Sequence, residues 1–430
     1  MHRSRIACAC RVGIAALLAC APAALRAQGL TRVSREDAVA AALQRGARMG
    51  VARADTTLAR AGVLGARQYE NPALGLSYSK SVPQEHYSLD IPIDFPWLRG
   101  ARIGSAEAAR ASAQHRFRFE RRAVEYDVDT LYTRVIASAA RARLSSRTAR
   151  DADSLLTLAK VRRDAGDGSE LDVQLAQVSA GQMANAAASD SLDAVGAVLG
   201  LQVAMGLSSE RVTVEPADTL ALPTVSVSAV RSAVDASAAA PSSDAASGGG
   251  APMPLLVAAA QSDVLAADQA LTQERRRTFP GASLSVGWEA KDPTGSEPGT
   301  LPTIGIAFPF PLFNRNDASV LAAQSQADRA RAQLALARVE SSAAIALAAR
   351  AMQSAMARAE RSGRLVSSAD RVAALSLTAF REGASALPNV LEAQRTAREA
   401  LSQYITDVAA ARNAAGLYQL LTLTANGINP

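Results

Sequence analysis

The side chains that most often carry out chemistry are scarce in this 430-residue chain. Hydrolysis or metal catalysis needs a cluster of histidine, cysteine or acidic groups at one site. The three cysteines are Cys8, Cys10 and Cys20, all close to the start of the chain, and only His86 and His115 follow them as histidines. We expect His86 beside a loop and His115 on a long helix, so the two do not predict a shared site. The sequence predicts no enzyme, no metal site and no cofactor.

Two carboxylates, Asp90 and Asp94, are set apart by their spacing. They occupy alternate positions of the stretch 87–95, and the other alternate positions of this stretch are apolar. A period of two places successive side chains on opposite faces of a strand. One apolar and one acidic face fit the wall of a membrane barrel, in which lipid meets the first and a wet lumen the second. Asp90 and Asp94 are then candidate pore-lining residues, although a half-buried strand of a soluble sandwich would show the same pattern once.

The alternating pattern recurs at 73–79, 283–289 and 303–311, which predicts two hairpins, over 69–97 and 279–313. Each arm is close to the roughly 9–11 residues that a tilted strand needs to cross a bilayer. Four strands do not close a barrel, because the smallest single-chain barrels have about eight, and an open edge in lipid leaves backbone groups unpaired. Transmembrane strands in this chain therefore require several copies to share one barrel.

The composition indicates long helices and excludes a nucleic-acid partner. Aromatic residues are only 4% and charged residues 20% of the chain, which suits helices packed through small side chains. The formal net charge of +6 includes four arginines of the leader, so the remainder carries about +2 (6 minus 4). No concentrated stripe of lysine and arginine restores a basic surface.

Residues 1–27 have the pattern of a secretory signal peptide, with a basic start, an apolar centre and small residues before Gln28. Cleavage after Ala27 is the expected processing, and a lipoprotein-type cut before Cys20, which would leave a lipid anchor there, is the alternative. The mature chain then has no cysteine and no disulfide. Beyond the leader no run of about 18 apolar residues predicts a transmembrane helix.

Two structural repeats are predicted, over 28–220 and 255–430, joined by a flexible linker rich in small residues over 221–254. Each repeat reads as a helix, a hairpin, a long helix without proline, a glycine turn and a return helix. We expect the first helix to run unbroken to about Arg67. The first long helix is expected from Gly100 to the turn near Gly166, about 66 residues and roughly 100 Å.

The two repeats align at an offset of 217 positions (383 minus 166) around their glycine turns. An internal duplication predicts that both halves form the same supersecondary unit. The aligned pairs are Gly166 with Gly383, Asp172 with Asn389, Val173 with Val390, and Ala176-Gln177 with Ala393-Gln394.

Three stretches resemble the TolC-like outer membrane efflux protein family, and the resemblance covers nearly all of the mature chain. They are 311–316, which looks like a corner motif of the heavy-metal (cobalt-zinc-cadmium) branch, and the glycine-turn segments 163–176 and 380–394. The resemblance implies a mainly α fold with a small transmembrane β part. It also implies a homotrimer whose 12-stranded β-barrel in the outer membrane is continued by a 12-helix α-barrel through the periplasm.

The family also implies roles for the residues around the glycine turns, which form its periplasmic tip. By position, the tight turns would contain Gly166, Gly168 and Gly383. Asp172, Asn389 and Glu392 would face the narrow entrance, where carboxylates favour cations. Asp172 could equally be a helix cap.

This chain departs from the family pattern at the tip. Where relatives carry a tyrosine hydroxyl and an arginine that hold the entrance closed, this chain has Phe380 and Ser385. Neither side chain can make the same hydroxyl bond and ion pair. Closure would rest on apolar packing or on other pairs, such as those of Arg381 and Glu382.

The resemblance implies the outer membrane channel of a tripartite efflux system, a passive duct for metal ions or drugs. Its partners would be a periplasmic adaptor, an inner membrane pump of the RND type and outer membrane lipid. A channel for type I protein secretion and a periplasmic coiled-coil scaffold without a barrel are the alternatives. The scaffold would leave the apolar strands without a partner.

Overall fold

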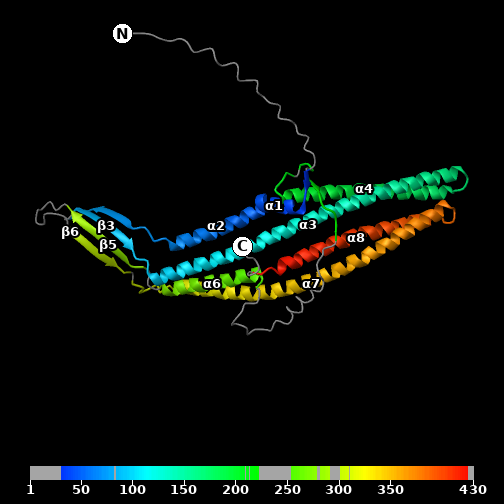
Figure 1. Ribbon diagram of the computed structural model, residues 1–430. Helices are drawn as coiled ribbons and strands as arrows, with labels where there is room; N and C mark the ends of the chain where they lie inside the picture. Colours follow the sequence, from blue (N-terminus) through cyan, green and yellow to red (C-terminus); the bar gives the residue numbers. More distant parts are fainter. Residues whose placement is uncertain are drawn as a thin grey trace, which may run out of the picture.

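The computed structural model describes residues 31–81, 84–208, 210–212, 214–221, 253–277, 281–290, 301–308 and 310–424. The predicted signal peptide, Cys20 and most of the predicted linker lie outside these residues. The described chain is elongated, with a sheet at one end and two helical hairpins that reach the other end (Figure 1).

The described part of the first half of the chain contains four helices and four short strands. A small parallel ladder joins β1 to β4, which are the first and the last strand of this half in sequence order. In chain order the elements are β1 (Thr31–Val33), α1 (Arg35–Arg45), α2 (Ala47–Arg67), β2 (Ala73–Tyr78), β3 (Glu85–Pro92), α3 (Pro96–Asp164), α4 (Glu170–Ala204) and β4 (Val214–Pro216).

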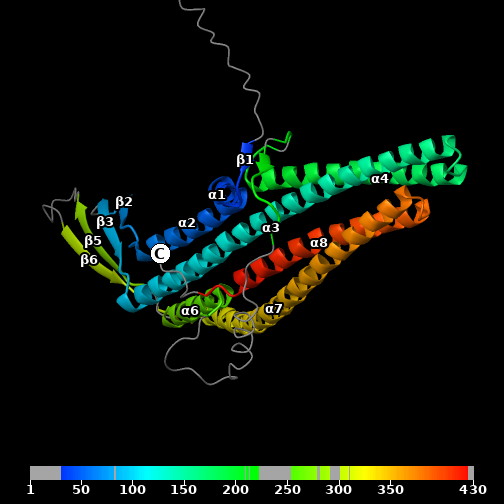
Figure 2. The same ribbon diagram turned by 45° about the vertical axis from the view of Figure 1, so that its right-hand side comes forward.

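The described part of the second half repeats the order helix, hairpin, long helix and return helix. Its elements are α6 (Leu255–Arg276), β5 (Ser283–Ala290), β6 (Leu301–Ala307), α7 (Asp317–Arg381) and α8 (Leu387–Leu421). Both views show α3 beside α4 and α7 beside α8, with the two hairpins pointing the same way (Figures 1 and 2).

The first helix is not continuous to Arg67, as the sequence had led us to expect, because it breaks at Gly46. This residue has an extended conformation, with φ −61° and ψ 129°, and it ends α1 and precedes α2. A Cβ atom at this position would lie 2.3 Å from the carbonyl oxygen of Ala42. Only glycine fits this close approach, so the chain can turn here without any proline.

The start of α3 also differs from the expectation, since this helix begins at Pro96 and not near Gly100. Proline is tolerated in a first helical turn, where its missing N–H would have no intrahelical partner. Similarly, α8 contains Pro388 in its first turn.

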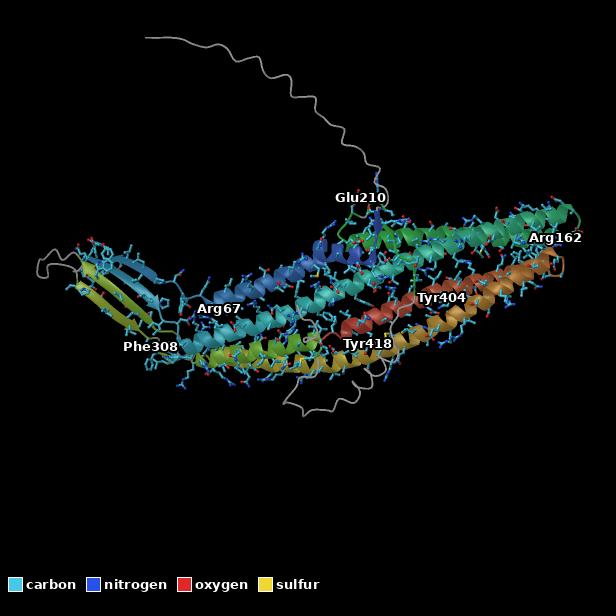
Figure 3. The ribbon with its side chains drawn as sticks, in the orientation of Figure 1. Arg67, Arg162, Glu210, Phe308, Tyr404 and Tyr418 are labelled. Carbon is cyan, nitrogen blue, oxygen red and sulfur yellow. The ribbon has the colours of Figure 1, made fainter. Side chains whose placement is uncertain are left out.

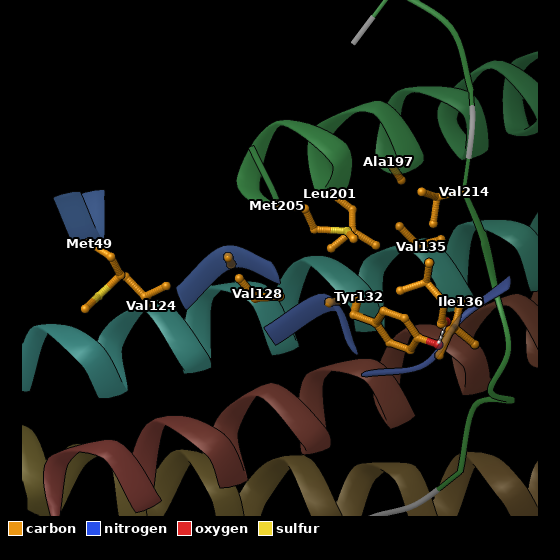
Figure 4. Close-up of a cluster of buried hydrophobic side chains, with 13 residues drawn as sticks. Met49, Val124, Val128, Tyr132, Val135, Ile136, Ala197, Leu201, Met205 and Val214 are labelled. Atoms are coloured by element: carbon orange, nitrogen blue, oxygen red, sulfur yellow. Dashed lines mark hydrogen bonds between the residues drawn. The ribbon is translucent and has the colours of Figure 1, made fainter. Parts of the chain in front are cut away.

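The core follows the apolar stripe of α3. Val124, Val128 and Val135 are buried in a cluster with residues of α1, the start of α2 and the end of α4, and Tyr132 is fully buried among them (Figure 4). The Tyr132 hydroxyl donates a hydrogen bond of 2.9 Å to the carbonyl oxygen of Val33. This bond ties the β1–β4 ladder to the middle of the long helix.

A four-stranded antiparallel sheet, in the order β2-β3-β5-β6, joins the two halves of the chain. Strands β3 and β5 are its centre, and β2 and β6 are its two edges. The sheet lies beyond the ends of α2, α3 and α6 (Figure 2). The structure therefore has the predicted mainly α fold with a small β part.

Candidate functional site

Both helical hairpins turn at a glycine in the left-handed conformation. Gly166 has φ +83° and Gly383 has φ +77°. The N–H of Gly166 donates to the carbonyl of Arg163 and the next N–H to that of Arg162, at 3.0 and 2.9 Å. Gly383 and its successor repeat this pattern. This is the Schellman arrangement, which satisfies the last carbonyls of a helix and needs glycine at the left-handed position.

Asp172 caps the return helix of the first hairpin. Ser169 Oγ donates to the Asp172 carboxylate at 2.8 Å, and the Asp172 N–H donates to Ser169 Oγ at 3.1 Å. The second hairpin has no such cap, because Ala386 stands at the equivalent position and Asn389 Nδ2 reaches only Ser385 Oγ, at 3.4 Å. The two tips therefore share a backbone turn but differ in their capping side chains.

A small apolar core joins the two tips. Its buried residues come from α3, α4, α7 and α8: Leu155, Ala159, Val173, Ala176, Phe380, Leu387 and Val390. Phe380 is only 5% exposed, and the Arg162 guanidinium lies 4.8 Å from the centre of its ring. Arg162 Nη1 also donates to the carbonyl of Phe380 at 3.1 Å. The aromatic residue that lacks a hydroxyl is thus held by an arginine of the other hairpin (Figure 3 labels Arg162).

The sequence did not predict the contact of Arg162 with Phe380. The position of Arg162 aligns with Ala379 at the offset of 217, so the duplication gives no signal for it. Only the packing of the two hairpins brings its guanidinium onto Phe380.

The residues expected at the entrance lie at the same end of the molecule. Gly168 and Ser385 are partly buried in the two turns, and Asn389 and Glu392 are exposed on the first turns of α8. Glu392 also lines a groove of about 270 Å³ between the two hairpins, together with Leu175, Leu391 and Arg395. Carboxylates from both hairpins thus lie near the tip.

The register of the sheet sorts its side chains into two faces. Leu74, Leu89, Val286 and Ile304 form one row across the four strands, and flanking rows contain Leu76, Tyr87, Trp288 and Pro302, and Ile91, Leu284 and Ile306. The opposite face carries small and polar residues, for example Gly75, Ser88, Gly287 and Thr303. Ile304 is 78% exposed and Ile306 is 70% exposed, so the apolar face has no cover within the described chain.

The two carboxylates predicted to line a pore have different surroundings. Asp90 lies on the small-residue face, between Ala73 and Ser285. Asp94 follows β3, is 12% exposed, and accepts a hydrogen bond of 2.7 Å from Arg102. Arg102 also donates to the carbonyl of Ala66 at the end of α2. Asp94 is thus the counterion of an arginine that holds the helix-to-strand junction.

An ionic network at the middle of the molecule was also not foreseen. Arg35 contacts the Asp129 carboxylate and lies 4.9 Å from the centre of the Tyr132 ring. Its backbone N–H donates to Asp218 Oδ2 at 3.2 Å. Burial and the nearby Arg412 charge lower the pKa of Arg35 to about 10. The network fixes α1 and the residues after β4 onto α3.

The described residues also limit the chemistry that this chain can perform. They contain no group of three or more histidine, cysteine or acidic side chains placed to hold a metal ion. Among the described helices, none is both long and apolar enough to cross a membrane.

Comparisons with known proteins agree on one kind of fold. A family model described as "Outer membrane efflux protein" matches residues 38–207 and 254–422. The cobalt-zinc-cadmium resistance protein CzcC of Cupriavidus metallidurans is 26% identical over 348 residues, which are 80% of this chain and 79% of that protein.

Two solved structures show the same architecture. The CmeC outer membrane channel of Campylobacter jejuni aligns with a TM-score of 0.74 at 12% identity, over 92% of this chain and 87% of the other. The outer membrane protein VceC of Vibrio cholerae aligns with a TM-score of 0.74 at 16% identity, over 91% and 96%.

Proposed function

The chain belongs to the outer membrane efflux protein family, and from this premise we propose that it is the outer membrane channel of a tripartite efflux assembly. In this proposal three copies form one continuous barrel, with strands in the bilayer and helices in the periplasm. A periplasmic adaptor and an inner membrane pump of the RND type work with it, and the channel itself is a passive duct.

The observation that carries the proposal is the sheet with one largely apolar face, on which Glu85 at the end of β3 is a charged residue. One row of leucine, valine and isoleucine crosses all four strands in register, with further apolar rows on either side of it, while the other face has small and polar side chains. Burying an apolar face of this size in lipid is favourable, and a water-filled lumen suits the other face. A periplasmic scaffold without a barrel would leave this face in water.

Several copies are needed to complete the wall. Within the described chain, β2 and β6 each pair on one side only, and a sheet edge cannot face lipid with its backbone groups unpaired. Pairing the β2 edge of one copy with the β6 edge of the next closes such a barrel without any edge. This is a head-to-tail interface, which closes into a ring.

A second contact surface for the neighbouring copy, besides the strand edges, runs along α7. Large apolar side chains recur on one side of this helix, within about 80° of one another at 100° per residue. Each is between 54% and 70% exposed. We call this set the α7 stripe: Leu321, Leu336, Val339, Leu347, Leu365, Val372 and Leu375. Its opposite side, with Met352 and Met356, already packs on α8.

Helix α4, on the other flank, offers a matching surface. Leu171, Val178, Leu192 and Val203 project on one side of it and are 59–72% exposed. In a ring of copies, the half of the α7 stripe nearer the tip contacts α4 of the next copy. Both flanks of one chain thus require a second copy of the same chain.

The cargo proposed is a metal cation. The CzcC relative is named for resistance to cobalt, zinc and cadmium, and carboxylates lie near the tip of this chain. Acidic groups at a narrow opening raise the local concentration of cations. The pump, and not the duct, would provide most of the selection among metals.

Purified protein tests the proposal. We expect a trimer that separates into monomers only on heating, and cation-preferring pores in planar bilayers. Leu347→Asp with Leu365→Asp places charges in the α7 stripe and should abolish the trimer, whereas Ser367→Asp, exposed on the same helix outside the stripe, should leave it intact. A wild-type monomer without conductance would contradict the proposal.

A further inference from the structure

A cluster of aromatic and basic side chains lies where the sheet meets the helices. Trp97 is 52% exposed, and Phe310 and Phe313 are 78% and 101% exposed. Beside them, Arg276, Arg277 and Arg315 are exposed. We call these six residues the junction patch; Figure 3 labels the neighbouring Phe308.

Hydrogen bonds bring the parts of the junction patch together from three segments. Arg276 Nη1 donates to the carbonyl of Trp97 at 3.0 Å, which places the end of α6 beside the start of α3. Asn316 Nδ2 donates to the carbonyl and to the carboxylate of Glu274, both at 2.9 Å. The segment 310–316 therefore lies against the same end of α6. The patch is a fixed part of the fold.

The positive charge of the patch exceeds what the protein neutralises. Among the described residues, Glu274 is the acid that pairs with an arginine of the patch: its carboxylate lies 3.6 Å from Arg277 Nη1 and also accepts from Asn316 Nδ2. Arg277 remains 60% exposed. Among the described residues, no hydrogen bond or ion pair reaches the Arg315 guanidinium. Exposed arginine side chains beside exposed aromatic side chains favour an anionic partner.

The arginines of the first repeat at the same level of the molecule differ from those of the junction patch, because they are paired within the chain. Arg67 pairs with Glu107 at 2.6 Å. Arg99 donates to the Tyr69 hydroxyl and to the carbonyl of Arg67, at 2.5 and 2.8 Å. These arginines stabilise the end of α2, whereas Arg277 and Arg315 of the junction patch are exposed to solvent. The difference indicates a role outside the chain's own fold.

We propose that the junction patch binds the headgroups of anionic phospholipids in the leaflet that faces the periplasm. This inference rests on the proposed placement of the sheet in a bilayer. The apolar face of the sheet ends at the patch, so the patch lies at headgroup depth. Exposed aromatic rings favour that depth, and guanidinium groups bind phosphate oxygens at close range. Anionic lipids attract arginines there.

The chain's two tryptophans allow a direct test. Trp97 belongs to the patch, and Trp288 lies on the apolar face, next to Tyr87 and away from the helices. Trp288→Phe leaves Trp97 as the reporter, and Trp97→Phe leaves Trp288. Each protein is placed in bilayers that contain brominated phosphatidylglycerol or brominated phosphatidylcholine at the same mole fraction.

We expect phosphatidylglycerol to be enriched about fivefold over phosphatidylcholine at Trp97, as judged by quenching, and not at Trp288. Arg277→Gln with Arg315→Gln should remove the preference, and Arg364→Gln with Arg371→Gln, exposed arginines near the tip, should keep it. Equal quenching of Trp97 by the two lipids would overturn the inference while leaving the channel proposal standing. Quenching of neither tryptophan would overturn the bilayer placement and the inference together.

Discussion

At the scale of single residues, one serine–aspartate pair occurs twice, part-buried in the first repeat and buried in the second. Ser145 Oγ donates to Asp190 Oδ2 at 2.6 Å, and Ser362 Oγ donates to Asp407 Oδ2. Both partners are displaced by 217 positions between the repeats (362 minus 145, 407 minus 190). Each pair crosses from the long helix to its return helix. A buried polar pair allows one register of two helices and penalises the others, because a shift leaves its groups unpaired.

Replacing Asp407 tests this register role. Asp407 is 5% exposed and also accepts from Gln403 Nε2 at 3.0 Å. Asp407→Ala leaves buried donors without an acceptor, so we expect a loss of about 1–3 kcal/mol in the free energy of unfolding. Glu399→Ala is the control, since its carboxylate is 64% exposed and, within the described residues, pairs with Arg395 alone. Equal unfolding midpoints for the two variants, by circular dichroism, would exclude the role.

A pH dependence is expected at the start of α1. The side-chain hydrogen bond from Ser34 Oγ, and then its backbone N–H, lower the pKa of Asp37 below its ordinary value of 3.8. A lowered carboxyl pKa stabilises the folded state above the ordinary pKa, and this contribution is lost as the pH falls through the lower folded value. Amide exchange in the first turn, corrected for its intrinsic rate, should therefore accelerate below about pH 3.8. Ser34→Ala should weaken this dependence, and an unchanged profile would contradict the assignment.

At the scale of elements, the two glycine turns decide the geometry of the helical hairpins. Gly166→Ala puts a Cβ on a residue with φ +83°, and we expect a cost of about 1–2 kcal/mol in the free energy of unfolding. Gly181→Ala, in the exposed middle of α4 with open space around it, should instead stabilise by up to about 1 kcal/mol. Denaturant unfolding of the two variants measures both changes in the free energy of unfolding. A neutral Gly166→Ala would show that the turn tolerates another conformation.

At the scale of the whole molecule, the parallel course of the two hairpins brings both tips to the same end, and in the proposed trimer each copy adds the same charges there. Asp172→Asn keeps an acceptor oxygen for Ser169 but removes the charge, and Glu392→Gln removes the other. We expect the double variant to lose most of its cation preference, measured as a reversal potential in a salt gradient. Glu360→Gln, exposed on α7, is the control. An unchanged potential would place both carboxylates away from the entrance.

Much of this architecture follows from local patterns. The alternation from Tyr87 to Phe95 determined which strand face is apolar, and the register confirms it, since Leu89 falls beside Leu74 and Val286. The family resemblance is confirmed as well. The glycines at 166 and 383 indicated tight turns, because no other residue adopts a positive φ as easily.

Only the tertiary structure decided which charged groups meet. Asp94 shares its strand pattern with Asp90, yet the packing of α3 beneath the sheet pairs it with Arg102. The contact of Arg162 with Phe380 likewise depends on a neighbour distant in sequence. Periodicity is a property of adjacent residues, so it specifies faces and turns. The partner of Arg162 depends on how helices separated by some 200 residues pack, and no local pattern carries that information.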